Sequence, residues 1–102
     1  MQVQVRAVNF TADHKLVRFV ENKLDKLTLF HDQIISSEVF LKLDNNTTEN
    51  KIAEIRLAIP GKELFAKRSD KSFEGAADAA VEALRRQIRK EKTKLQKAAV
   101  GH

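Results

Sequence analysis

The sequence predicts an α+β fold in the order β-α-β-β-β-α, with four strands in one sheet and two helices packed on one face of it. Three observations lead to this prediction. Four segments alternate apolar and polar residues, as half-buried strands do. Two longer segments repeat apolar residues at helical spacing, so each helix has one apolar face. Short turns separate the last three strands, which predicts an antiparallel meander.

The first strand is predicted where Val3, Val5 and Ala7 alternate with polar residues. Thr11 is the predicted N-cap of the helix that follows. This helix has one apolar face, which carries Leu16, Val17, Val20, Leu24 and Leu27. Its pattern ends near residues 30–32. Because a helix follows the first strand, this strand can pair in parallel with a neighbour through a crossover.

The remaining strands are separated by turn-forming residues at 44–48 and at Pro60-Gly61. Their alternating apolar residues are Val39, Leu41 and Leu43, then Ala53, Ile55, Leu57 and Ile59, and, in a short fourth strand, Leu64 and Ala66. The opposite sheet face is expected to be open to solvent. It would carry Gln4, Arg6, Phe40, Lys42, Glu54, Arg56, Phe65 and Lys67. Packing against strand neighbours explains the two phenylalanines better than base stacking does.

The last helix is predicted to begin after an N-cap at Ser72 and to run to about Ala98, since no proline follows Pro60. Its length would be about 40 Å, whereas a strand of eight residues spans about 26 Å. The helix should therefore extend beyond the sheet. Its apolar stripe becomes sparse after the sixth member; the stripe consists of Phe73, Ala77, Ala80, Val81, Leu84, Ile88 and Leu95.

The positive charge is concentrated where this stripe thins. The 102-residue chain has a net charge of +5, and residues 85–97 carry seven cations and one acid, so the rest of the chain sums to −1. The cations are Arg85, Arg86, Arg89, Lys90, Lys92, Lys94 and Lys97. Complementing the helix dipole accounts for two or three of these, so a polyanionic partner is indicated. The absence of cysteines, of an apolar leader and of a membrane-length apolar run predicts a cytoplasmic protein.

Catalytic patterns are not found in the sequence. His14, His31 and His102 are far apart, and the three glycines form no phosphate-binding loop. Carboxylates such as Asp25 and Glu82 alternate with bases along the helices, so they are expected to be solvated charges. The sequence thus predicts a non-enzymatic binding protein without a cofactor, a metal or a small-molecule substrate.

The basic residues are distributed around the exposed surface of the last helix. At 100° per residue, Arg86, Lys90 and Lys97 lie opposite Leu84, and the other cations lie on the two flanks. Such a surface suits a groove lined by phosphates better than a flat membrane, because the helix lacks a bulky apolar wedge. The first helix adds a second basic set, which comprises Lys15, Arg18, Lys23 and Lys26.

Two segments resemble a known family. Residues 84–95, LRRQIRKEKTKL, resemble the signature helix of the ribosome hibernation promoting factor family, and residues 19–27, FVENKLDKL, resemble its KLxKL segment. The similarity covers residues 1–98 and is to the short form, which includes sigma-54 modulation and ribosome-associated inhibitor A-like proteins. It departs from the family at Ser72-Phe73-Glu74, where Asp-Met-Tyr is frequent, and at Glu91, where an aromatic residue is frequent.

The resemblance implies a single ribosome-binding domain over residues 1–98 and a short tail over 99–102. Family members bind the small ribosomal subunit in the channel of messenger and of A- and P-site transfer RNA, and inhibit translation in stationary phase or stress. The rRNA-binding residues carried over are Lys23, Lys26, Arg86, Arg89, Lys90, Lys92 and Lys94. A monomer is expected, and ribosome dimerisation through the extra C-terminal domain of the long form is not.

Two alternatives remain open at the level of the sequence. The basic helix could dock on an acidic groove of a protein partner. The layout of strands and helices, which is similar to that of a double-stranded-RNA-binding domain, could also serve general duplex RNA binding.

Overall fold

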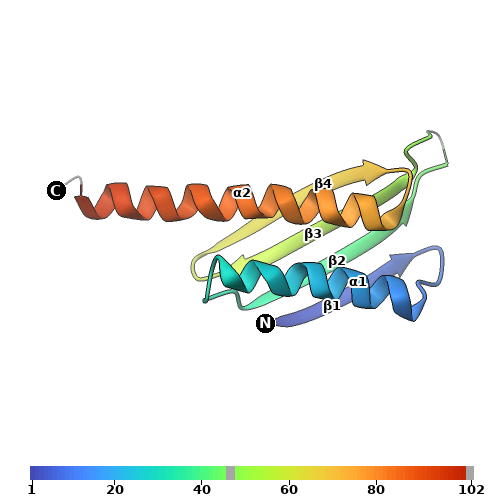
Figure 1. The fold of residues 1–102 in the computed structure, drawn as a ribbon, viewed down its shortest axis with the longest axis horizontal. Helices are drawn as coiled ribbons and strands as arrows, with labels where there is room; N and C mark the ends of the chain where they lie inside the picture. Colours follow the sequence, from blue (N-terminus) through green and yellow to red (C-terminus); the bar gives the residue numbers. More distant parts are fainter. Residues whose placement is uncertain (46–47, 101–102) are drawn as a thin grey trace.

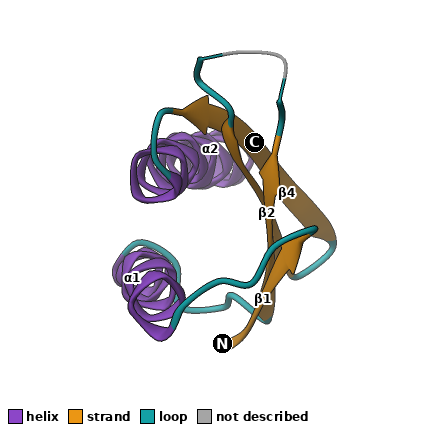
Figure 2. Cartoon of the chain, turned by 90° about the vertical axis from the view of Figure 1, so that its right-hand side faces the viewer, coloured by secondary structure: helices purple, strands orange, loops and turns teal. Residues whose placement is uncertain are grey.

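The computed structural model describes residues 1–45 and 48–100, with side chains described as far as Glu91. The elements in chain order are β1 (Gln2–Val8), α1 (His14–Asp25), the 3-10 helix η1 (Lys26–Leu29), β2 (Ser36–Leu43), β3 (Lys51–Ile59), β4 (Lys62–Asp70) and α2 (Phe73–Val100). The strands form one sheet in the order β1-β2-β3-β4, in which only the β1–β2 pair is parallel. Both helices cover the same face of this sheet (Figure 2). The predicted α+β fold is confirmed.

The N-cap predicted for α1 was wrong. The helix begins at His14, and Asp13 is its N-cap, with extended backbone angles and an Oδ1 that accepts a hydrogen bond from the Leu16 N–H at 2.8 Å. Thr11 lies too far before the first turn to reach these amides. At the other end, α1 passes directly into η1, which continues the apolar face by burying Leu27.

The meander is confirmed, but β4 is longer than predicted. Gly61 has a φ of +74°, which fits the third residue of a type II turn after Pro60. From this turn, β4 pairs with β3 over its whole length, as far as Asp70 opposite Lys51. The apolar pattern revealed only the part of β4 that packs on the core, since Lys67 and the residues after it are polar.

Small side chains form the contact surface of α2. Four alanines are buried there together with Phe73, Val81, Leu84 and Ile88; they are Ala76, Ala77, Ala80 and Ala83. Helix α2 packs on β3 and β4. An alanine surface allows a helix to lie close to a sheet, and the four alanines span about two turns of α2. The start of α2 is fixed by Ser72. Its Oγ accepts a hydrogen bond from the Gly75 N–H at 3.0 Å, as predicted for the N-cap.

Helix α2 extends well beyond the sheet (Figure 1). Its 28 residues correspond to about 42 Å, whereas nine residues of strand correspond to about 30 Å. The molecule is accordingly elongated, with extents of 51 × 26 × 18 Å. Ile88 is the last buried residue among the described side chains, and Glu91 accepts a hydrogen bond from Lys62 Nζ at 2.5 Å, beside the turn between β3 and β4. None of the described helices combines the length and hydropathy that a membrane crossing requires.

The first turn of α2 has an unusual requirement for glycine. A Cβ at Gly75 would lie 1.5 Å from Oδ2 of Asp70, whose Oδ1 accepts a hydrogen bond from the Lys71 N–H at 2.8 Å. The carboxylate thus occupies the space of the missing side chain, near the positive end of the helix dipole.

We therefore expect Gly75→Ala to forgo the stabilisation of about 1 kcal/mol that this change usually brings within a helix. In an Asp70→Ala background most of this gain should return, because the obstructing carboxylate is gone and only Ser72 Oγ remains near the added Cβ, at 3.1 Å. A double-mutant cycle measured by urea unfolding tests this coupling. Additive effects of the two substitutions would contradict the steric account.

Candidate nucleic-acid interface

The solvent side of α2 carries the predicted cations. Arg86, Arg89 and Lys90 are exposed, while Leu84 and Ile88 on the opposite side are buried. Arg86 and Lys90 make no hydrogen bond or ion pair with any other described side chain. The predicted contacts Lys92 and Lys94, together with Leu95 and Lys97, lie outside the described side chains, although their backbone continues the helix.

Gln87, which belongs to the recognised helix segment, supports the fold. Its Nε2 donates a hydrogen bond to the backbone oxygen of Phe65 at 2.8 Å. Phe65 lies in β4, an edge strand, where backbone groups on the outer side lack a strand partner. The glutamine therefore anchors α2 to the sheet edge within the basic segment and fixes the direction in which the cations point.

A groove of about 300 Å³ separates the two helices, which run side by side in the same direction (Figure 1). One wall comes from α1, η1 and the residue after it, and the other comes from α2. The lining side chains are Lys23, Lys26, Leu27, Leu29 and Phe30 on the first wall and Asp78, Val81, Glu82 and Arg85 on the second. The groove therefore has an apolar base and a charged rim.

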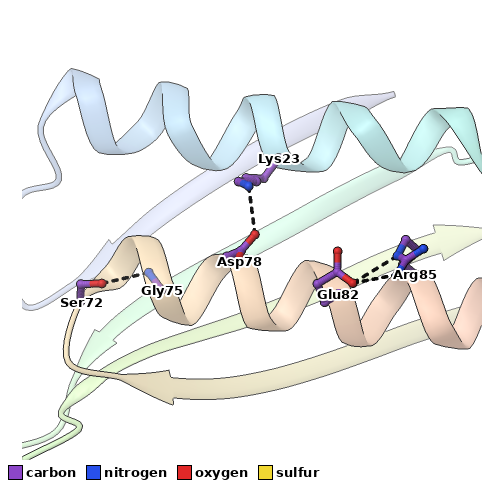
Figure 3. A network of polar contacts seen from close by, with 6 residues as sticks. All are labelled: Lys23, Ser72, Gly75, Asp78, Glu82 and Arg85. Atoms are coloured by element: carbon purple, nitrogen blue, oxygen red, sulfur yellow. Dashed lines mark hydrogen bonds and ion pairs between the residues drawn. The ribbon is translucent and has the colours of Figure 1, made fainter.

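Four of the charges along this rim form two pairs (Figure 3). Lys23 Nζ of α1 lies 3.0 Å from Asp78 Oδ1 of α2. Arg85 donates two hydrogen bonds to Glu82 Oε2, at 3.0 and 3.2 Å, and its guanidinium lies 5.6 Å from the ring centroid of Phe30. Glu82 is a solvated helix charge, as expected, with a side chain 46% exposed, and it also orients Arg85.

The structure brings Lys23 and Lys26 of the first basic set next to α2. Both line the groove, where Lys26 is exposed and Lys23 has a side chain 29% exposed. Arg85 joins them across the groove, although it was not among the predicted contact residues. The i, i+3 spacing of Glu82 and Arg85 was the sequence signal for its position. The groove and the exposed side of α2 thus form one continuous basic region.

The open sheet face has a different character. Two of its cations are paired with acids, Lys42 with Glu54 at 2.8 Å and Arg56 with Glu63 at 3.9 Å. Arg6 and Lys42 lie 6.0 and 5.9 Å from the ring centroid of Phe40. Phe40 therefore packs with its strand neighbours, as expected, and this face offers less unpaired positive charge than α2.

No metal site is found in the described part of the chain, where no group of three or more potential ligands is placed to hold an ion. His31 takes part in a local turn instead, since its Nδ1 accepts a hydrogen bond from the Gln33 N–H at 3.0 Å.

The combination of this fold with a basic helix has known counterparts. The family model described as sigma 54 modulation protein / S30EA ribosomal protein matches residues 3–96. The chain belongs to this family. It is 33% identical over 101 residues to the ribosome hibernation promotion factor of Deinococcus radiodurans. The alignment covers 95% of this chain but 52% of that protein. It is 30% identical to the ribosome hibernation promoting factor of Klebsiella oxytoca, covering 93% and 97% of the two chains. The chain thus spans about half the length of the first relative.

Solved structures show the same architecture. A ribosomal subunit interface protein from Coxiella burnetii superposes with a TM-score of 0.83 at 19% identity, over 91% of this chain and 99% of that one. The N-terminal domain of Thermus thermophilus Protein Y superposes with a TM-score of 0.78 at 25% identity, over 88% and 98%. The first of these likenesses establishes the fold alone.

The ion pair across the groove is expected to contribute little to stability. Lys23 and Asp78 have side chains 29% and 52% exposed, and such pairs contribute between about 0 and 1 kcal/mol. A double-mutant cycle of Lys23→Ala and Asp78→Ala, followed by thermal or urea unfolding, should give a coupling in this range. A coupling above about 2 kcal/mol would mean that the pair holds the helices together and that Lys23 is unavailable to a ligand.

Proposed function

We propose that this protein is a ribosome hibernation factor that inhibits translation by binding small-subunit rRNA in the decoding channel, in place of messenger and of A- and P-site transfer RNA, under stress or in stationary phase. The observation that carries the proposal is the position of the basic segment. Residues 85–97 begin beside Ile88, the last buried residue among the described side chains, and continue along the part of α2 that extends beyond the sheet. A projecting cationic rod can enter a recess lined by phosphates, which a rounded basic patch cannot.

Family membership supports the ribosome as the partner. The two relatives described above carry names that refer to ribosome hibernation, and one of the structural neighbours is named for the ribosomal subunit interface. Ribosome binding also fits a protein that acts in the cytoplasm as a monomer.

The proposed mechanism requires no chemical step. Lysines and arginines displace counterions from rRNA phosphates, and the body of the protein occupies the path of the natural ligands. Among the described residues, Arg86, Arg89 and Lys90 on α2 and Lys23 and Lys26 beside the groove would make these contacts. Lys92 and Lys94 would extend them along the projecting segment.

Reversing two of the exposed cations should abolish binding. We expect Arg86→Glu/Lys90→Glu to lower co-sedimentation with purified small subunits at least tenfold, because two attractive contacts become repulsive. Neither side chain packs in the core, so circular dichroism should show an intact fold.

The matched control is Arg68→Glu/Lys71→Glu, which changes the net charge equally at the opposite end of α2, where both residues are exposed. This variant should pellet with subunits as the wild type does. An equal loss of co-sedimentation in both variants would mean that net charge, rather than the position of the cations on α2, determines binding. Unchanged binding of the α2 variant would favour a protein partner for the molecule.

The affinity should depend steeply on salt. Five to seven phosphate contacts predict a slope of log affinity against log salt of roughly −4 to −6. Titrations of fluorescent protein with small subunits at several salt concentrations measure this slope. A slope near zero would rule out the counterion-release mechanism, and efficient competition by free duplex RNA would indicate general duplex binding instead.

A further inference from the structure

We propose that the groove between α1 and α2 captures one unpaired guanine base of the bound RNA. The inference rests on the proposed function in that it takes RNA as the ligand, and it adds a base-specific subsite to a surface otherwise suited to phosphates.

The size and shape of the groove suit a single base. Its volume of about 300 Å³ is at the lower limit for small-molecule sites. Leu27 and Val81 form an apolar base, since both are buried while lining the groove. A second hollow of about 130 Å³ is lined by Phe30, Arg85, Ile88 and Arg89, so Phe30 and Arg85, which are in cation–π contact, line both hollows.

The Phe30–Arg85 pair provides a stacking surface. Unpaired bases in protein–RNA complexes stack on aromatic rings and on guanidinium planes. Here both kinds of surface are combined, and Glu82 holds the guanidinium through two hydrogen bonds. Lys26, exposed on the same rim, is placed to meet the phosphate of the captured nucleotide.

The acids of the groove distinguish this subsite from a phosphate site. A carboxylate repels phosphate, yet Asp78 and Glu82 lie among the cations that should attract RNA. Ionised carboxylates only accept hydrogen bonds, so their natural partners in RNA are the N–H groups of bases. Both bonds from Arg85 go to Glu82 Oε2, and Oε1 has no partner among the described residues. In Figure 3 this second oxygen points away from Arg85, toward the side of α1.

The acceptor geometry selects guanine among the four bases. Guanine presents two adjacent donors, N1–H and the N2 amino group, and the groove offers two acceptors without a partner among the described residues, Glu82 Oε1 and Asp78 Oδ2. Uracil has one N–H on its pairing edge, and adenine and cytosine have only the amino group there. A bidentate pair of this kind discriminates against the wrong base by about tenfold or more.

The experiment uses the full chain and three single-stranded heptanucleotides, which contain one central guanosine, inosine or uridine among uridines. Fluorescence anisotropy should show that the guanosine RNA binds about tenfold tighter than the all-uridine RNA. The inosine RNA should bind close to the all-uridine RNA, because inosine lacks the N2 amino group and, like uridine, offers one N–H on its pairing edge. Amide signals of Leu29, Phe30 and Val81 should shift most strongly with the guanosine RNA.

Glu82→Gln tests the role of the carboxylate, because the two accounts of the groove predict opposite changes in RNA affinity. If Glu82 accepts base donors, this variant loses the guanosine preference. If the groove faces only phosphates, removing a negative charge strengthens binding to all three RNAs. The matched control Glu74→Gln removes an exposed acid in the first turn of α2, outside the groove, and should keep the preference.

Equal affinity of the wild type for the three RNAs, or a guanosine preference that survives in Glu82→Gln, would overturn the proposal and leave the groove to a peptide partner. Co-sedimentation with small subunits is measured in parallel. A protein that pellets with subunits but shows no base preference loses only this subsite. One that prefers guanosine RNA but does not pellet keeps the subsite and loses the ribosomal function.

Discussion

The close contact between the alanine surface of α2 and strands β3 and β4 is the interaction on which the rest of the structure depends. Ala76, Ala80 and their buried neighbours hold the helix against the sheet, and Leu84 and Ile88 complete the contact. Ile88 is the last buried residue among the described side chains, and the helix continues beyond the end of the sheet (Figure 1). The same element thereby stabilises the domain at one end and presents charge at the other.

The groove results from the positions of the two helices on the sheet. Helix α1 covers the β1 side of the sheet and α2 the β4 side, so the two meet along a line above the sheet centre (Figure 2). Small residues on α2 face the sheet, and charged residues such as Asp78 and Glu82 face the line of contact. Opposite charges can pair there at low cost because the rim remains hydrated. A hollow with mixed polarity results, rather than a closed helix–helix interface.

Much of the architecture was predictable because periodicity reports which side of an element is buried. It identified the four strands, both helices, the N-cap Ser72 and the extension of α2 beyond the sheet. Periodicity did not identify the N-cap of α1, because Thr11 and Asp13 are both short polar residues that can cap a helix and both precede the first apolar residue. It also failed where a strand leaves the core, as β4 does beyond Ala66. The basic residues could be located by counting charge, whereas the groove could not, since it depends on the distance between helices.

The order of the strands in the sheet has a consequence for how the chain folds. Strands β2, β3 and β4 and helix α2 follow one another in sequence and in space, so their contacts close short loops. The parallel pairing of β1 with β2 instead requires closure across the whole of α1, at a higher entropic cost. Contacts of low sequence separation form faster. We therefore expect the meander with α2 to form first, and β1 with α1 to dock last and open first. The wall of the groove that carries Lys23 and Lys26 therefore belongs to the less stable part of the domain.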